Sequence, residues 1–289
     1  MICTLCPRRC GAERTETEGH GFCGMPAGVR VARAALHMWE EPPISGVNGS
    51  GTVFFSGCTL RCAYCQNGSI SAGGFGKAIT TQHLREIFDE LIAHGAHNIN
   101  LVTPTHFLPW ILPALEPKLS VPVIYNCGGY ESVDTLRTLE GKVDIYLPDL
   151  KYADDALAGT LSAAPDYFPV AAAAIQEMFR QTGPCVLEDG LLKRGVVIRH
   201  LVLPGQLDNT RRCIDWVAEH FRPGQVLFSL MSQYTPQEGA EGALRRHVTR
   251  AEYRAAVSYM ENCGITDGFT QERTAARAEY TPPFDLTGV

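Results

Sequence analysis

The sequence has no apolar run that approaches the length of a membrane-spanning helix, and its first residues lack a basic region followed by an apolar stretch. It also has no long run of Lys or Arg, and 31 acidic against 25 basic residues give a formal net charge of -6. Because phosphate backbones are bound by clustered cations, nucleic acid is a poor candidate ligand. We therefore expect a soluble, cytoplasmic protein that binds neither a membrane nor a nucleic acid.

Cysteine, in contrast, is abundant, with eleven residues in 289. An odd number disfavours a complete disulfide framework, and a reducing compartment keeps thiols free to bind metals. Most of the sulfur is therefore expected to serve another purpose than cross-linking.

The chain is long enough, and with 45% hydrophobic residues apolar enough, to bury a full core. Residues 1–47 differ in composition from the rest of the chain, because they contain four cysteines, several charges and a glycine-rich stretch. We expect them to form a small metal-binding module and linker. Residues 48–289 alternate short apolar runs with amphipathic segments. That alternation is typical of a parallel α/β domain.

The apolar runs are continuous, as expected for strands covered on both faces. They lie at 51–55, 98–102, 122–125, 143–147, 196–202 and 225–230. The amphipathic segments predict helices at 80–94, 107–116, 131–139, 165–181, 208–221 and 249–262. Thr80-Thr81 and Asp208-Asn209 are the candidate N-caps among these helices.

Six strand-helix units favour a partial (β/α)6 barrel, with a flat doubly wound sheet as the alternative. Each predicted strand is followed by polar residues or glycine, and the carboxyl ends of barrel strands meet at one rim, where catalytic groups gather. The stretch 56–67, which follows the first strand, is therefore expected on that rim.

Cys58, Cys62 and Cys65 form a C-x3-C-x2-C pattern in this stretch. A structural zinc site normally takes four protein ligands, commonly as two separate C-x2-C pairs. A four-iron cluster takes one thiolate per iron, so three cysteines leave one iron open to another ligand. The spacing thus predicts a [4Fe-4S] cluster that lacks one protein ligand.

The stretch 58–65 resembles the signature of radical S-adenosylmethionine (SAM) enzymes, in which SAM chelates the open iron inside a partial (β/α)6 barrel. Gln66-Asn67 and the stretches 149–151 and 198–205 are similar to the branch of pyruvate formate-lyase-activating enzyme. The stretches 40–46, 98–106 and 230–234 resemble even more closely an uncharacterised subgroup of the homologues of that activating enzyme. The resemblance implies an oxidoreductase that cleaves SAM reductively to a 5'-deoxyadenosyl radical, which abstracts hydrogen from a substrate. It also implies an electron donor such as flavodoxin or ferredoxin.

The resemblance also implies residues that contact SAM. Lys151 is suited to its carboxylate and is counted among the catalytic candidates, Arg199 to a carboxylate or the ribose, Tyr64 to adenine and Asn126 to ribose hydroxyls. Further candidates at the strand ends are Asn67, Thr103, Thr105, Asp149 and Gln233.

Two positions depart from the family pattern. Where many relatives carry Gly-Gly-Glu-Pro, this chain has the stretch 103–106, so a carbonyl or hydroxyl has to meet the amino group of SAM. Where the activating enzyme has a histidine, this chain has Gln233.

Several candidates also have a purely structural interpretation. Thr103, Thr105 and His106 could cap the helix expected near 107. Asp149 and Lys151 could form a surface ion pair. Arg199 and His200 alternate along one strand, so only one should face the interior, and we favour Arg199.

The remaining thiols have other settings. Cys127 is expected on the rim, with packing favoured over hydrogen donation, and Cys185, Cys213 and Cys263 are expected to be ordinary side chains. The stretch 37–41 either folds over the barrel mouth or forms a solvated linker.

Cys3, Cys6, Cys10 and Cys23 can surround one further metal, and such a short segment needs a metal to hold its shape. Zinc, a single iron and an auxiliary iron-sulfur cluster are all compatible with four thiolates. Two disulfides are the alternative, and His20 is a possible substitute ligand.

Three functions follow. The first is activation of a partner glycyl radical enzyme by abstracting hydrogen from a backbone glycine. The second is radical modification of a small molecule or a protein side chain. The third, from another class, is a noncatalytic iron-sulfur or zinc protein that carries electrons or scaffolds partners.

Overall fold

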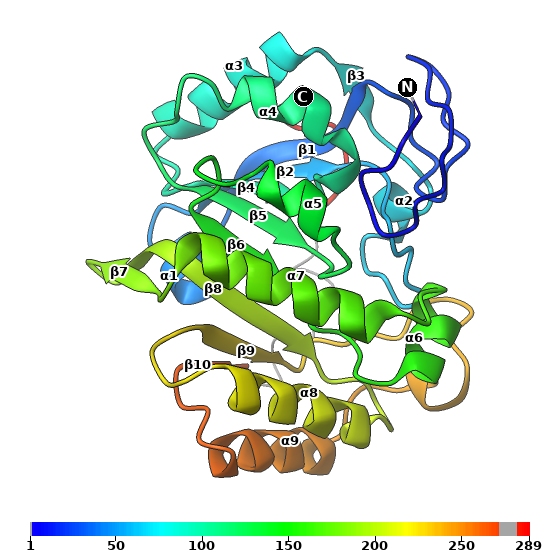
Figure 1. Ribbon diagram of the computed structural model, residues 1–289, viewed down its shortest axis with the longest axis vertical. Helices are drawn as coiled ribbons and strands as arrows, with labels where there is room; N and C mark the ends of the chain where they lie inside the picture. The colour runs from blue at the N-terminus through cyan, green and yellow to red at the C-terminus, as the bar shows by residue number, and fades with distance from the viewer. Residues whose placement is uncertain (1, 272–281) are drawn as a thin grey trace.

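A computed structural model describes residues 2–271 and 282–289. The strands form one mixed sheet in the order β10-β9-β8-β6-β5-β4-β2-β1-β3, with β7 paired to β8 (Figure 1). Their bounds are β1 Val29–His37, β2 Ser50–Phe55, β3 Lys77–Ile79, β4 Ile99–Val102, β5 Val123–Cys127, β6 Ile145–Pro148, β7 Val186–Glu188, β8 Leu191–Leu201, β9 Leu227–Met231 and β10 Gly268–Thr270.

The central strands β2, β4, β5, β6, β8 and β9 pair in parallel and in chain order. A doubly wound sheet would reverse its strand order at a switch point. No such reversal occurs along these strands, so the expected partial barrel is confirmed. Strand β10 adds a further parallel strand beside β9, and β1 adds an antiparallel one beside β2.

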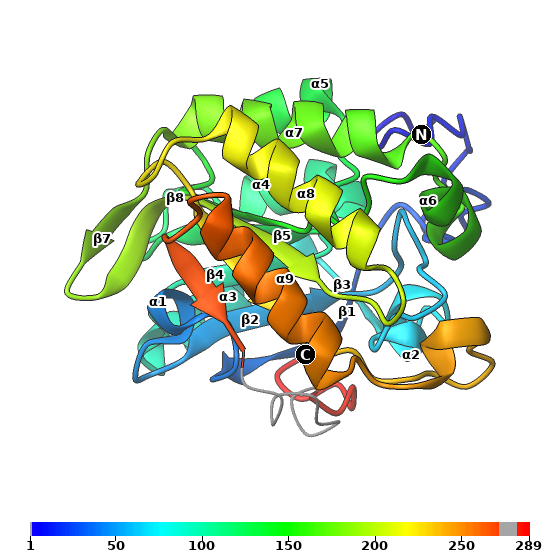
Figure 2. The ribbon, with the colours of Figure 1, turned by 90° about the horizontal axis from the view of Figure 1, so that it is seen from below.

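The helices follow the strands and pack against the sheet. Figures 1 and 2 show α7 and α8 side by side over one of its faces. The bounds are α1 Pro42–Ser45, α2 Gly68–Ser71, α3 Thr81–Ala93, α4 Leu108–Ala114, α5 Val133–Arg137, α6 Asp155–Ser162, α7 Tyr167–Thr182, α8 Leu207–His220 and α9 Arg250–Asn262, with 3-10 turns η1 Thr105–Phe107 and η2 Gly242–Arg245. Every helix expected from the sequence is present within a few residues.

The N-cap expectations had mixed outcomes. The Thr80 side chain accepts a hydrogen bond from the His83 N–H and starts α3, as expected. The expectation for Asp208-Asn209 was wrong, because α8 begins at Leu207 without a side-chain cap. Asn209 is buried instead, with its side chain in the barrel-rim loop described below.

Alternation along the strands divides the core into two parts. Outward side chains such as Tyr125, Tyr146 and Ile198 belong to the large cluster beneath the helices. A smaller cluster contains Ile44 of α1 with inward-facing residues of three strands: Ile124, Ile145, Leu147, Leu192 and Val197. Helix α1 therefore fills the inner part of the barrel and leaves room only nearer the carboxyl ends of the strands.

The expected boundary at residue 47 stays a prediction. Strand β1 lies before it, yet β1 pairs with β2 along most of its length, with Ala34 opposite Val53. Residues 2–28 form irregular loops beside α2, at the end to which the strand arrows point (Figure 1). In the part of the chain that the structure describes, no helix is both long and apolar enough to cross a bilayer.

Candidate active site

The three-cysteine loop leaves β2 through a turn that requires glycine. Gly57 has a φ of +81°, and a Cβ there would lie 2.2 Å from Cγ of Met25. Only glycine reaches this conformation without strain or collision. The loop is therefore directed to the rim while resting against the N-terminal segment.

Each sulfur of the loop accepts a hydrogen bond. The Leu60 N–H lies 3.3 Å from Sγ of Cys58. The hydroxyl of Ser162, at the end of α6, donates to Cys62 at 3.0 Å, and that of Ser71 donates to Cys65 at 3.3 Å. Hydrogen bonds to thiolate sulfur are among the features that tune iron-sulfur clusters.

The electrostatics of the loop also fit a cluster. Burial raises the pKa of Cys58 to about 12, and the neighbouring Cys62 and Cys65 raise it further. Burial likewise raises the pKa of Cys65. Three thiolates at this place therefore need bound positive charge.

No group of three or more His, Cys, Asp or Glu side chains in residues 2–271 and 282–289 is arranged to hold a single metal ion. A four-iron cluster takes each thiolate on a different iron, so its sulfurs need not converge on one point. The arrangement of the loop is therefore compatible with the cluster.

A cavity of about 230 Å³ lies beside the loop, on the inner side of the sheet. It brings together most of the residues predicted from sequence, which are Cys62, Tyr64, Cys65, Asn67, Asn126, Asp149, Lys151, Arg199 and Gln233. These residues come from the rim loops and from the ends of β5, β6, β8 and β9. The polar strand ends do converge, as the barrel prediction required.

Arg199 is the centre of a hydrogen-bonded charge network in the cavity. Its Nε donates to Oδ1 of Asp149 at 2.9 Å, and its terminal nitrogens donate to Asn126 at 2.7 Å and to Glu40 at 3.2 Å. Nζ of Lys151 donates to the other oxygen of Asp149 at 2.5 Å. The ion pair of Asp149 with Lys151 is thus part of the site and not of the surface.

Opposite charges fix the ionisation of this network. Burial disfavours the carboxylate of Asp149, but Arg199 and Lys151 outweigh burial and hold its pKa below the ordinary value. Burial also disfavours the Lys151 ammonium, yet Asp149 raises the pKa of Lys151 above its usual range. Both groups are therefore charged at neutral pH.

Glu40 is the member of the network that the sequence reading did not assign to the site. Its carboxylate accepts hydrogen bonds from Asn100 at 3.1 Å and from Asn126 at 3.3 Å. Burial raises the pKa of Glu40, while Arg199 opposes that shift. The stretch 37–41, left open as a lid or a linker, therefore lies against the barrel interior. The overlapping stretch 40–46 contributed to the family resemblance, but nothing in its sequence pattern predicted a position inside the barrel.

Tyr64 contributes a buried ring to the cavity wall. Tyr152 donates to the Tyr64 hydroxyl at 2.9 Å, and the hydroxyls of Tyr152 and Ser162 are 2.7 Å apart. Because Ser162 also bonds Cys62, these hydroxyls join the cavity wall to the cysteine loop. Gln66 connects the cysteine loop to the end of β9, because its side-chain amide donates a hydrogen bond to the Gln233 backbone carbonyl at 2.9 Å.

Not every candidate lies at the cavity. Thr105 is buried in a separate group, where it donates to Glu131 at 3.0 Å and accepts from Tyr125 at 3.0 Å. Burial raises the pKa of Glu131 to about 7. Thr103 does not line the cavity either, and its φ of +59° is uncommon for a non-glycine residue. Neither threonine caps α4, whose first turn has no side-chain cap.

The two histidines beside the candidates are buried. His106 lies 2.7 Å from the Ser56 carbonyl, and burial lowers its pKa to about 4. His200 lies 2.6 Å from the Leu150 carbonyl, on the side of β8 opposite to Arg199, as alternation predicted. Asn209 completes this support by bonding the Ala153 N–H at 2.8 Å and the Lys151 carbonyl at 3.0 Å.

The remaining thiols are consistent with packing. Cys127, Cys213 and Cys185 are buried or half-buried, and Cys263 is half-buried beside Asp215. Burial raises the pKa of Cys127 well above its usual value. Cys127 is therefore a neutral thiol behind the rim.

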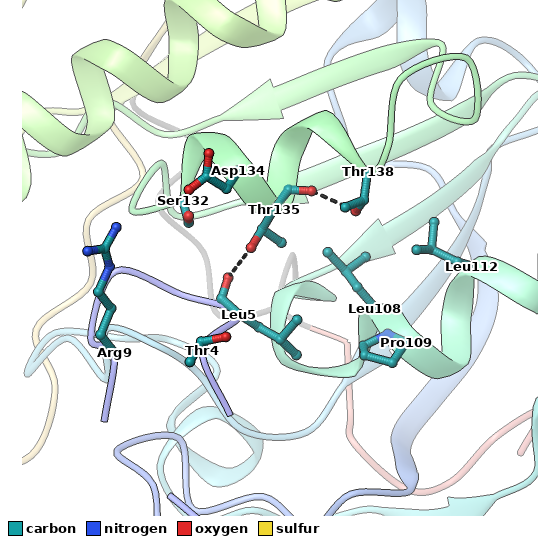
Figure 3. A pocket seen from close by; sticks show the side chains of 10 residues that line it. All are labelled: Thr4, Leu5, Arg9, Leu108, Pro109, Leu112, Ser132, Asp134, Thr135 and Thr138. Atoms are coloured by element: carbon teal, nitrogen blue, oxygen red, sulfur yellow. Dashed lines mark hydrogen bonds between the residues drawn. The ribbon is translucent and has the colours of Figure 1, made fainter. Parts of the chain in front are cut away.

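The N-terminal segment supports the cysteine loop from outside. Arg8 donates to the Thr59 carbonyl at 2.9 Å and to the Ser162 carbonyl at 2.7 Å. Leu5 accepts from Thr135 at 2.7 Å across a groove of about 490 Å³ between this segment and α4 and α5 (Figure 3). The segment thus contacts the cysteine loop, the end of α6 and helix α5.

All eleven cysteines are free thiols, so the disulfide alternative for the N-terminal four is not realised. Cys3, Cys6 and Cys23 are buried and Cys10 is exposed. Burial raises the pKa of Cys6 to about 12. The exposed His20 lies 3.6 Å from Glu18. A second metal site is not shown by this arrangement.

Known proteins resemble the chain in sequence and in fold. Residues 46–103 match the family described as 4Fe-4S single cluster domain. An uncharacterized protein of Methanocaldococcus jannaschii is 30% identical over 275 residues, which cover 91% of this chain and 75% of that protein.

Two solved structures share the fold. Streptococcus suis SuiB bound to S-adenosylmethionine gives a TM-score of 0.52 at 14% identity, over 74% of this chain and 48% of SuiB. Methylornithine synthase (PylB) gives a TM-score of 0.50 at 15% identity, over 71% of this chain and 59% of the synthase. The chain thus matches about half the length of SuiB.

The family match covers the cysteine loop, and the fold matches extend over more than two thirds of the chain. Cys58, Cys62 and Cys65 lie within the matched residues, and their three thiols would hold a four-iron cluster. The chain accordingly belongs to the same family as the uncharacterized protein of Methanocaldococcus jannaschii, matches a 4Fe-4S single cluster domain, and has the fold of the SAM-bound SuiB.

Proposed function

We propose that this enzyme is an activating enzyme, which abstracts a hydrogen atom from a backbone glycine of a partner glycyl radical enzyme. When bound, the cluster and SAM supply the one-electron chemistry that yields a 5'-deoxyadenosyl radical. The observation that carries the proposal is the single cavity shared by Cys62, Cys65 and the network around Arg199. The activating-enzyme branch is supported by the resemblance of Gln66-Asn67 and of the stretches 149–151 and 198–205.

In this proposal the network binds and orients SAM. Lys151 presents a compact cation beside Cys62 and Cys65, suited to the carboxylate of SAM, and Asn126 presents an amide for the ribose. Asp149 and Arg199 hold these two groups in register, because Asp149 bonds Lys151 and Arg199 bonds Asn126. Tyr64 offers a flat apolar surface for adenine. Asn67 and Gln233 complete the wall.

One departure from the family pattern shapes the proposal. No glutamate follows β4 at 103–106, and Thr103 and Thr105 do not line the cavity. Glu40 does line it, and it presents a carboxylate from a different part of the chain. We therefore propose Glu40, rather than a threonine hydroxyl, as the acceptor for the amino group of SAM.

Two accessory roles belong to the same proposal. A one-electron donor such as flavodoxin or ferredoxin reduces the cluster. Cys3, Cys6, Cys10 and Cys23 bind a second metal as zinc, iron or an auxiliary iron-sulfur cluster, since four thiols within 21 residues include three that are buried. Metal analysis of protein with these four cysteines changed to alanine should show the loss of that metal, while the central cluster is retained.

Reductive cleavage of SAM is the first test. Anaerobically reconstituted, reduced protein should break the bond between sulfur and the 5' carbon of SAM and release methionine and 5'-deoxyadenosine. The Cys62→Ala variant should release neither. A fully loaded, reduced protein that cleaves no SAM would instead support a noncatalytic electron carrier or scaffold.

The partner is tested separately. Reaction mixtures with candidate glycyl radical enzymes should develop a glycyl radical signal by electron paramagnetic resonance, dependent on SAM. Cleavage of SAM without such a signal for any partner would contradict the activating role. It would favour the second candidate, modification of a small molecule or a side chain, for which the cavity described next has a suitable size.

A further inference from the structure

A second cavity, of about 360 Å³, adjoins the first. The stretch 39–42 lines one side of it. The other side is formed by β8, β9 and β10 through Arg199, Ser229, Met231, Gln233, Gly268, Phe269, Thr270 and Gln271. Five residues line both cavities, namely Trp39, Glu40, Arg199, Met231 and Gln233. A molecule in the second cavity therefore lies next to the place proposed for SAM.

Glu41 lines the second cavity but not the first. It is 8% exposed, and its Oε2 has no hydrogen-bond partner among the described residues. Ser229 and its own backbone N–H favour the ionised form without satisfying that oxygen. A buried carboxylate oxygen without a partner costs free energy, so its presence calls for a ligand.

The charges around Glu41 do not compensate it. Arg199 pairs with Glu40 and Asp149, and Lys151 pairs with Asp149. Within the described chain no ion pair includes Glu41. Two anions and two cations therefore offset each other, so an ionised Glu41 carboxylate adds one negative charge that no ion pair balances. Burial raises the pKa of Glu41 and Glu40 adds to that shift, while Arg199 opposes it.

The apolar part of the cavity also suits a cation. Trp39 and Phe269 line it, and Trp39 is 62% exposed. Aromatic faces attract ammonium and guanidinium groups, most strongly when a carboxylate lies nearby and water is partly excluded. An anionic ligand would repel the Glu41 carboxylate, and a neutral donor would satisfy its oxygen without balancing its charge.

We infer that the second cavity binds a positively charged amine or guanidinium group of the substrate, with Glu41 as its counter-ion. The inference rests on the proposed function only in calling that ligand the substrate. The same chemistry is found in a Lys or Arg side chain next to the target glycine of a partner protein and in a small amine.

Isothermal titration of reconstituted, SAM-saturated protein tests this binding directly. The cationic probes are agmatine and 1,5-diaminopentane, and the matched probes are neutral 1,5-pentanediol and anionic glutarate. Both cations should bind measurably more tightly than the matched probes. Equal binding of the neutral probe would overturn the inference.

The Glu41→Gln variant keeps the side-chain shape and removes the charge. It should weaken binding of both cations at least tenfold while leaving SAM affinity unchanged. The Glu219→Gln variant makes the same change at an exposed position of α8 and should have no effect. Unchanged cation binding in Glu41→Gln, or a parallel loss of SAM binding, would overturn the inference.

A second variant keeps the test decisive if Glu41→Gln does not fold. Trp39→Leu changes an exposed side chain at the same cavity and should weaken agmatine binding several-fold through the lost aromatic face. Unchanged agmatine affinity in that variant would count against the inference.

Two further comparisons separate the sources and the hypotheses. The probes Nα-acetyl-lysine amide and Nα-acetyl-arginine amide keep the charged side chain. If they bind as tightly as the small amines, the natural ligand is a protein side chain, and weaker binding would indicate a small amine. SAM cleavage is measured separately from titration. Loss of cleavage with intact cation binding would defeat the proposed function alone.

Discussion

Replacing Asp149 with Asn should destabilise the protein strongly. The substitution keeps the side-chain shape but removes the charge that Arg199 and Lys151 share, through contacts of 2.9 and 2.5 Å. The three side chains are only 14–18% exposed, so water cannot replace the lost partner fully. Lys151 has no other ion pair within the described residues, whereas Arg199 keeps Glu40.

The magnitude follows from the geometry. Removing one partner of a buried ion pair costs about 3–5 kcal/mol, because a buried charge is left uncompensated. Since the residual exposure and Glu40 offer partial compensation, we expect a loss near the lower bound, about 3 kcal/mol. At about 2 °C per kcal/mol for a chain of this size, the melting temperature should fall by about 6 °C.

Urea unfolding followed by circular dichroism measures this loss. The control is Asp208→Asn, which removes an ion pair between Asp208 and Arg211 whose carboxylate is 91% exposed. That control should change stability by less than about 0.5 kcal/mol. Equal stability of the two variants at pH 7 would refute the reasoning.

The pH dependence has a definite sign. The pKa of Asp149 is depressed in the folded state, so its contribution is complete above the unfolded pKa of about 3.9. The difference between the wild type and Asp149→Asn should therefore be constant from pH 7 to about pH 5 and shrink as pH falls below about 4.

Two further predictions concern groups next to the site. Burial raises the pKa of Glu131 to about 7 in the folded state, so the free energy of unfolding should fall as pH rises from about 4.5 through 7, by at most about 3 kcal/mol. Urea unfolding of Glu131→Gln at pH 5 to 8 should show a flatter dependence on pH. An unchanged slope would contradict the raised pKa of Glu131. Ser162→Ala removes the hydroxyl that donates a hydrogen bond to Cys62, which should make the cluster harder to reduce. A redox titration followed by electron paramagnetic resonance should show a more negative midpoint potential. Thr160→Ala, on the exposed side of α6, is the control and should leave the potential unchanged.

The sequence predicted the features that follow from local pattern. Continuous apolar runs located the six barrel strands, because strands buried on both faces exclude polar residues. Alternation placed Arg199 inward and His200 outward, as contacts with Asp149 and Leu150 confirm. The spacing of three cysteines indicated the cluster, which the match to a 4Fe-4S domain bears out.

What the sequence did not reveal depends on contacts between distant segments. Glu40 reaches Asn100, Asn126 and Arg199, which are 60 to 159 residues away, and no local periodicity encodes such contacts. Asn209 was predicted to cap a helix because asparagine is common at N-caps, but its side chain instead donates a hydrogen bond to the Lys151 carbonyl. Strand β1 was missed because its alternation breaks at a bulge between Val31 and Arg33, where Val31 and Ala32 are both buried.

Iron and acid-labile sulfide in anaerobically reconstituted protein test the central claim most directly. The account predicts that a four-iron cluster is lost when Cys58, Cys62 and Cys65 are all changed to Ala. It also predicts that adding SAM alters the electron paramagnetic resonance signal of the reduced wild-type cluster. A triple variant with the same iron and sulfide content as the wild type, or a reduced wild-type cluster whose signal is indifferent to SAM, would contradict the account.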